Sequence, residues 1–471
     1  MVRTVKLVAA LAVLTHLFAS PGCSRDGSPH PKTVDASDTG DGQVEGKDSS
    51  VDRIGSGSPE VSPEGGVATA CFRGLGAPPK PVVSKAPLIA EPKVVWTKKL
   101  GGLVATGDRV VIGNGFIAAT AAGVVYFVNK RTQAVKSWGS GGIELFNTIT
   151  VGNDGNVLVS GFSAYAVTPE GTLSWQVNLG PPIDNEWSFC DTSYSKSSNT
   201  LFSLCNNGQL YGLRIGALAP SWSSRFYVSG ALDSRIMPGF GDILSIAPGP
   251  RLNRGEIQFF AAEDGQALVA PGNIPGAGFA LYSGGLLTSQ PTMKAYDKCG
   301  RLLWETGEND QYVVPIVVGL PDETIFAMAG TVSSSAGRKL QLHNSATGAV
   351  VAERLAADTE TPIAAGADGA YYSLTCSPFS SEETPAAPEI VAYDSALNEK
   401  WRKSLVIADL GAPTYRCPRW GVALDLDGML YLVAEERTGT FVMAVQTQSP
   451  GPAPTVWPLH FGDNRGTNWA E

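Results

Sequence analysis

Between residues 295 and 304 the chain reads Ala295-Tyr296-Asp297-Lys298-Cys299-Gly300-Arg301-Leu302-Leu303-Trp304. An apolar segment with a central tyrosine is followed by a short turn that contains glycine, and then by a second apolar segment that ends in tryptophan. Glycine accepts the positive φ that tight hairpins require, so this stretch predicts two antiparallel strands joined by a short turn.

The strand that ends in tryptophan recurs along the chain. Between Trp138 and Trp401 the repeat averages about 44 residues, which suits four short antiparallel strands and is typical of a propeller blade. No segment shows the sustained 3.6-residue pattern of an amphipathic helix. The strand ends in question are Trp96, Trp138, Trp175, Trp222, Trp304 and Trp401, with the apolar segments 267–269 and 350–352 filling two gaps in the series.

Turn residues support the same register. Residues that accept positive φ lie shortly before five of the strands that close a blade, and a second set of Asp-Gly turns precedes another group of strands. The first set is Gly171, Gly265, Gly300, Gly348 and Asn398, and the second set lies at 153–155, 367–369 and 426–428.

These segments resemble the quinoprotein-like (PQQ-like) β-propeller repeat. The resemblance rests on Ala295-Tyr296-Asp297 with Trp304, on Ala392-Tyr393-Asp394 with Trp401, and on the C-terminal segment 457–467, and it covers about residues 93–467. It implies that the tryptophans dock one blade against the next. The predicted fold is therefore all-β, a single β-propeller of eight four-stranded blades, with seven as the alternative.

Ring closure follows from the strand count. Seven outer strands lie between residues 138 and 401, and three more strands are expected between Trp420 and Thr447. We expect the fourth strand of that last blade to come from the N-terminal segment Pro92–Trp96, because closure removes exposed sheet edges.

The N-terminus has the features of an exported lipoprotein. Arg3 and Lys6 precede an apolar run that ends at Phe18, and Gly22-Cys23 then resembles a lipobox, although Ser20 stands where leucine is usual. The predicted divisions are a lipoprotein signal peptide (1–22), the lipidated Cys23 with a disordered acidic tether (23–70), a Pro-rich lead-in (71–92) and the propeller (93–471). Lipid on Cys23 would anchor the chain in a bacterial cell envelope. By resemblance to enterobacterial lipoprotein sorting, Ser24 in place of aspartate after the cysteine implies the outer membrane, on its periplasmic side or at the surface. An ordinary secretory signal with an incidental cysteine is the alternative.

Six cysteines remain after Cys23, an even number that suits disulfides in an exported protein. Blade topology places Cys190 and Cys205 on neighbouring strands, and it places Cys376 and Cys417 in loops on one face. Cys71 and Cys299 are expected on the opposite face. The predicted pairs are 190–205, 376–417 and 71–299, and a zinc site is disfavoured because no Cys-x-x-Cys occurs.

Several kinds of chemistry find no support in the sequence. The formal net charge is −9 and no basic stripe is present, which argues against nucleic-acid binding. Only His343 and His460 lie in the folded part, so a Ser-His-Asp triad would have to use one of them. Quinoprotein alcohol dehydrogenases carry adjacent cysteines near their cofactor, whereas this chain has no Cys-Cys pair. We therefore predict no cofactor, no metal and no catalytic residue.

Two functions remain open. The first is a non-enzymatic, monomeric propeller that binds or scaffolds a protein or an envelope polymer through one face. The second is a quinoprotein-type or glycan-acting enzyme with a site over the central channel. The longest insertions (247–255, 376–388 and 402–417) are expected on the face away from the membrane. Their candidate binding residues are Arg251, Asn253, Arg254, Phe379, Glu382, Glu383 and Tyr415.

Overall fold

The chain separates into two units, Met1–Gly66 and Val67–Glu471. All residues described in the computed structural model belong to the second unit. They are 92–101, 110–121, 123–141, 146, 148–179, 190–205, 208–225, 235–240, 243–247, 257–268, 274, 279–282, 285–288, 292–297, 299–306, 312–319, 323–329, 338–357, 360–375, 388–405, 422–436, 439–453 and 469–470.

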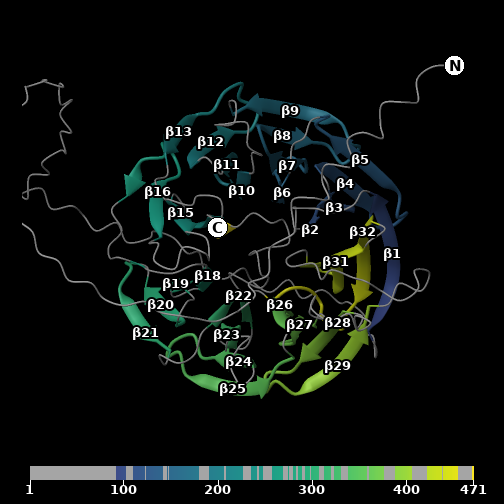
Figure 1. Ribbon diagram of the computed structural model, residues 1–471, viewed down its shortest axis with the longest axis vertical. Coiled ribbons are helices and arrows are strands. Elements are labelled where there is room, and N and C mark those ends of the chain that lie inside the picture. The colour runs from purple at the N-terminus through teal and green to yellow at the C-terminus, as the bar shows by residue number, and fades with distance from the viewer. Residues whose placement is uncertain are drawn as a thin grey trace, which may run out of the picture. The chain divides into compact units, whose positions relative to one another are not determined.

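The second unit is a ring of eight antiparallel sheets, which we number blades 1 to 8 in chain order (Figure 1). In seven of them four consecutive strands run from the centre to the rim. From inner to outer strand, blades 1 to 4 are β2 (Val110–Ile112), β3 (Phe116–Ala121), β4 (Val124–Asn129) and β5 (Val135–Gly139); β6 (Ile149–Val151), β7 (Val157–Ser160), β8 (Ser163–Val167) and β9 (Leu173–Asn178); β10 (Cys190–Ser195), β11 (Thr200–Cys205), β12 (Gln209–Arg214) and β13 (Trp222–Arg225); and β14 (Arg235–Phe240), β15 (Ile243–Ala247), β16 (Gln258–Ala261) and β17 (Ala267–Leu268).

The second half of the ring continues the pattern. Blades 5 to 7 are β18 (Phe279–Tyr282), β19 (Gly285–Thr288), β20 (Lys294–Asp297) and β21 (Leu302–Glu305); β22 (Tyr312–Gly319), β23 (Thr324–Ala329), β24 (Lys339–His343) and β25 (Val350–Leu355); and β26 (Thr361–Ala365), β27 (Tyr371–Thr375), β28 (Glu389–Tyr393) and β29 (Glu399–Ser404). Blade 8 takes β30 (Val422–Leu424), β31 (Met429–Glu436) and β32 (Gly439–Gln446) from the C-terminal part and β1 (Lys93–Gly101) from the N-terminal part. The prediction of eight blades is confirmed.

The N-terminal strand closes the ring as expected. β1 pairs antiparallel with β32, with Lys93 opposite Gln446 and Gly101 opposite Thr440. β1 is longer than the predicted segment, because its pairing continues past Trp96 for five more residues. Its apolar side chains pack on the clusters between blade 8 and both neighbouring blades.

The core consists of layers between neighbouring blades. Each of the hydrophobic clusters draws its side chains from two adjacent sheets: for example, Val317 and Phe326 of blade 6 pack with Tyr371 and Val391 of blade 7. Inner and middle strands such as β2 and β8 are buried along their whole length, whereas the outer strand β25 is exposed at alternate residues. Burial of an apolar side chain contributes about 1.5–3 kcal/mol, so contacts between blades dominate the stability of the ring.

Three outer-strand tryptophans bond the following blade, as the resemblance implied. The indole Nε1–H of Trp175 donates to the Ala217 carbonyl at 2.6 Å, and that of Trp304 donates to Ser345 O at 2.9 Å. In both cases the acceptor lies in the turn between the third and fourth strands of the following blade. Trp222 makes the same bond to Ala262 O at 3.1 Å.

Glycine in these turns makes room for the indole rings. A Cβ atom built on Gly348 would lie 2.5 Å from the Trp304 ring, and one on Gly265 would lie 2.3 Å from the Trp222 ring. The predicted positive φ is confirmed for Gly171, Gly265, Gly300 and Gly348, but Asn398 was the wrong residue in its turn. Leu397 takes the positive φ there (58°), while the Asn398 backbone N–H and amide bond the Asp394 carboxylate.

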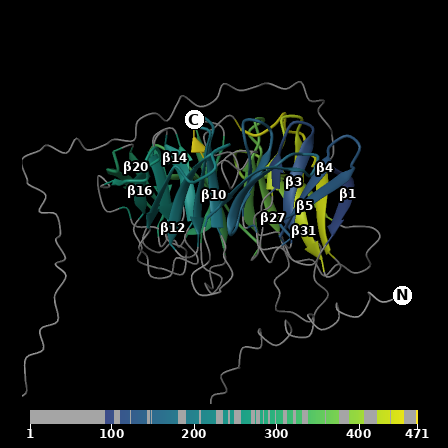
Figure 2. The same ribbon diagram turned by 90° about the horizontal axis from the view of Figure 1, so that it is seen from above.

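One strand was not predicted. β33 (Trp469–Ala470) runs parallel to β14 and adds a fifth strand at the inner edge of blade 4. Figure 1 shows it near the centre of the ring, and Figure 2 shows it toward one face.

Candidate functional site

The two faces of the ring differ in what connects the strands. On one face, here called the loop face, second strands lead to third strands and each blade leads to the next. Ala247, Thr375 and Ser404 end their strands on this face. The opposite, turn face carries the short hairpins at Gly300, Gly348 and Gly428. All three predicted insertions leave from the loop face, with the correction that the last begins after Ser404, because β29 extends to that residue.

Two of the insertions leave blade 7 side by side. The Leu405 N–H, just after β29, donates to Pro388 O at 2.8 Å, just before β28. The Thr375 hydroxyl at the end of β27 donates to Glu389 O at 3.1 Å, and Arg402 Nη1 lies 2.7 Å from the Glu389 carboxylate. The segments 376–387 and 406–421 therefore share a base built from β27, β28 and β29.

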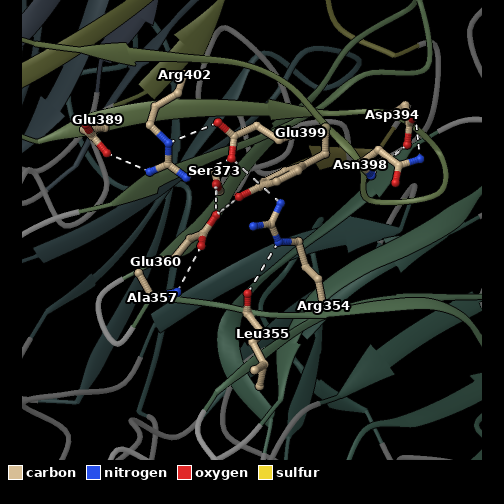
Figure 3. Close-up of polar contacts among 11 residues, drawn as sticks. Arg354, Leu355, Ala357, Glu360, Ser373, Glu389, Asp394, Asn398, Glu399 and Arg402 are labelled. Carbon is tan, nitrogen blue, oxygen red and sulfur yellow. Dashed lines mark hydrogen bonds and ion pairs between the residues drawn. The ribbon is translucent and has the colours of Figure 1, made fainter.

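A buried carboxylate lies at the same edge of blade 7. Glu360, immediately before β26, is only 2% exposed. Its Oε1 accepts hydrogen bonds from the hydroxyls of Ser373 and Tyr393, and its Oε2 accepts from the Ala357 N–H at 3.2 Å (Figure 3). Burial raises the pKa of Tyr393 well above its ordinary value, and the bond to Glu360 raises it further, so the phenol stays protonated and keeps donating.

Arg354 connects this network to blade 6. Its guanidinium lies over the Tyr393 ring at 4.6 Å and within 4.0 Å of the Glu399 carboxylate. Arg402 Nη2 bonds the same carboxylate at 2.9 Å, and this hydrogen bond lowers the pKa of Glu399. The arrangement is a chain of alternating charges that crosses from β25 to β29 (Figure 3).

Leu355 is the apolar member of this edge. It ends β25 next to Arg354 and is 67% exposed. An exposed leucine flanked by ordered charged side chains has the composition of a small binding surface, with an apolar centre and a polar rim. A lone exposed leucine is common on protein surfaces. The choice of this edge as a candidate binding surface therefore rests on the charged neighbours of Leu355 and on the strand ends from which the two insertions leave.

The described residues form no reactive constellation around this edge. The Glu360 oxygens are held by three donors, and buried His343 places Nδ1 3.0 Å from Gly348 O and Nε2 3.2 Å from the Gln341 side chain. Within the described part of the chain, no three His, Cys, Asp or Glu side chains gather in a way that could hold a metal ion. What the geometry provides is a charged surface whose side chains are held by hydrogen bonds and ion pairs.

Only some of the predicted site residues lie in the part of the chain that the structure describes. The Cys190–Cys205 disulfide is present and joins β10 to β11, and Cys299 is also disulfide-bonded. The remaining predicted residues lie outside the described residues: Cys23, Cys71, Cys376, Cys417, Arg251, Asn253, Arg254, Phe379, Glu382, Glu383, Tyr415 and His460.

Sequence reasoning missed the Glu360 network. In the sequence Tyr393 stands out only as part of a repeat, and Glu360 precedes an apolar strand with no motif around it. A carboxylate directly before an inner strand, with a polar Ser373 inside an otherwise apolar strand, was the available signal.

No protein-family model matches the sequence, and neither does any curated protein. By structure, the chain is similar to BamB from Moraxella catarrhalis, with a TM-score of 0.51 and 12% identity over 76% of this chain and 100% of that one. It is also similar to the computationally designed Ika8 protein, with a TM-score of 0.52 and 13% identity over 74% and 98% of the two chains. These likenesses support the propeller fold. No helix among the described residues is long and apolar enough to cross a membrane.

Proposed function

We propose that this protein is a non-catalytic binding module of the bacterial cell envelope, which takes a protein or an envelope polymer on its loop face. The observation that carries the proposal is that the two faces of the ring differ in which segments of the chain reach them. The three long insertions leave from the loop face, whereas β1 begins and β33 ends toward the turn face. The first and last described strands thus lie toward the turn face, and this supports a partner on the loop face.

The anchor is part of the same proposal. A lipid on Cys23 followed by a flexible tether of 47 residues would give a root-mean-square reach of about 40 Å. β1 starts level with Gln446 at the turn face, which supports an orientation with the loop face away from the bilayer. A Cys23→Ala variant should therefore move from the membrane pellet to the soluble fraction, and its unchanged sedimentation would remove the anchor from the proposal.

The base of the insertions has the properties of a prepared binding surface. The buried Glu360 network and the Arg354, Glu399 and Arg402 pairs fix side chains that would otherwise lose rotamer freedom on binding. Ordering a long side chain at an interface costs about 0.5–1.5 kcal/mol, so a surface that is ordered in advance binds more tightly.

Site-specific photo-cross-linking tests the proposed face. Ser404 and Ser395 are both exposed serines of blade 7, at the loop-face and turn-face ends of the β28–β29 hairpin. Each is replaced by a photo-cross-linking amino acid in the full chain in cells. We expect a discrete cross-linked partner from position 404 and none from position 395. Cross-links from 395 alone, with both variants folded, would overturn the proposed orientation.

A further inference from the structure

Cys299 is disulfide-bonded, and it lies in the short turn that joins β20 to β21 on the turn face of blade 5. Cys190 and Cys205 are bonded to each other, so neither is its partner. The partner is therefore one of the other cysteines of the sequence, which are Cys23, Cys71, Cys376 and Cys417. The positions of the described strands distinguish between them.

Cys376 is too far away to be the partner. It directly follows Thr375, the last residue of β27, so the peptide bond holds it on the loop face of blade 7. β27 is about 15 Å long at about 3.3 Å per residue, and Cys299 lies on the opposite face with blade 6 in between. Two bonded cysteines have Cα atoms within about 7 Å of each other, which excludes Cys376.

Cys417 and Cys23 are excluded for other reasons. Cys417 lies five residues before Val422, which begins β30 at the loop face of blade 8, and five extended residues reach at most about 18 Å. Blades 6 and 7 separate blade 8 from blade 5, and packed sheets lie about 10 Å apart, so Cys417 does not reach the far face of blade 5. Cys23 is the proposed lipid site, and a lipid bonded to its sulfur would leave no thiol to oxidise.

Cys71 has the necessary reach. It lies 22 residues before Lys93, where β1 begins at the turn face, and that length of chain spans at most about 75 Å. The turn face of blade 5 is therefore within its range, although β21 and β1 lie on different sides of the ring (Figure 1). We propose that Cys299 is bonded to Cys71 and that this disulfide fixes the end of the membrane tether to blade 5. The pairing is independent of the lipid anchor, whereas the pull that it bears rests on the proposed function.

The turn that carries Cys299 is well held and suits an attachment point. Asp297 Oδ1 accepts the N–H groups of Cys299 and Arg301, each at 2.9 Å, and Asp297 Oδ2 lies 3.2 Å from Arg301 Nε. The strand that follows is fixed to blade 6 by the buried Trp304, whose indole donates to Ser345 O. A pull on Cys299 is therefore distributed over blades 5 and 6.

β1 is less suited to bear the same pull. None of its nine residues is buried, and Lys93 forms the first pair of its ladder with β32, opposite Gln446. A force applied at Lys93 would separate these pairs one after another from that end. Because the proposed tether ends next to Cys71, the disulfide transfers the pull to blade 5, and β1 stays paired while the chain is anchored.

Peptide mapping of the unreduced full chain tests the pairing. Trypsin should yield peptide 299–301 linked to peptide 54–73, which contains Cys71, and reduction should release both. A link from 299–301 to a peptide that contains Cys376, Cys417 or Cys23 would overturn the proposal, and so would a free thiol at Cys71.

Single-molecule pulling tests the attachment. The chain is held in detergent by its two ends in magnetic tweezers, as the parent, as a Cys71→Ser/Cys299→Ser variant, and as a Cys190→Ser/Cys205→Ser control that lacks the disulfide within blade 3. Only the first variant should release β1 as its first step, which frees residues 93–109 and lengthens the chain by about 55 Å. Release of β1 as the first step in the parent chain would overturn the attachment role, whether or not the variant folds. Failure of the anchor proposal is distinct, because it appears as unchanged sedimentation of Cys23→Ala.

Discussion

At the scale of single residues, Glu360 has the largest energetic role that the described contacts suggest. Replacement by alanine would leave the hydroxyls of Ser373 and Tyr393 and the Ala357 N–H without their acceptor. Loss of a buried, fully bonded carboxylate should lower the free energy of unfolding by about 2–4 kcal/mol, measured by urea denaturation. The control is Glu170→Ala, which removes an exposed carboxylate in the turn before β9 and should change stability by less than about 1 kcal/mol. Equal effects of the two substitutions would contradict this account.

Residue-level features were also the least predictable from sequence. Glu360 is bonded by Ser373 and Tyr393 from later strands of blade 7, and nothing within its local sequence reports those contacts. The turn at 394–398 shows the same limit: asparagine tolerates positive φ well, yet Leu397 adopts it, because its side chain is buried in the cluster between blades 6 and 7. Tertiary packing overrode the local preference.

At the scale of elements, the contact between an outer-strand tryptophan and the next blade's turn glycine joins the blades. Gly348 and Gly155 both lie in hairpin turns with positive φ, but only Gly348 has a ring against it. Gly155→Ala should cost about 1–2 kcal/mol for the backbone alone. Gly348→Ala should cost about 1–3 kcal/mol more, because its Cβ would lie 2.5 Å from the Trp304 ring.

A double-mutant cycle separates the two contributions. In a Trp304→Ala background the ring is gone, so Gly348→Ala should cost no more than Gly155→Ala does in the parent chain. Thermal or urea unfolding of the four variants measures this. A cost at Gly348 that is the same with and without the indole would show that the contact does not matter.

At the scale of the whole molecule, the repeat pattern was sufficient for the architecture. Outer strands were recognisable because their tryptophans and turn glycines recur at a nearly constant interval, and each of the seven predicted outer strands between 138 and 401 is present. Even the two that lack tryptophan, β17 and β25, were located by spacing. β33 could not be predicted, because a two-residue strand has no periodicity and its partner is more than two hundred residues away.

Ring closure by β1 leads to the last prediction. β1 covers the edge of β32, and Trp96 and Leu100 pack on the cluster between blades 8 and 1. A chain that begins at Leu103 would lose these contacts and expose the β32 edge, whereas one that begins at Glu91 keeps them. The shorter chain should therefore melt at a lower temperature and self-associate, because an unpaired edge invites pairing with another chain. The part-buried Lys130–Asp425 ion pair also joins blade 1 to blade 8, at 2.5 Å, but a single ion pair cannot cover the edge of β32 in place of the strand. Calorimetry measures the melting temperatures of the two chains, and light scattering measures their association states.

A peptide of residues 92–101 added to the shorter chain should restore part of the lost stability. Identical melting and a monomeric state for both chains would mean that β1 is dispensable for closure.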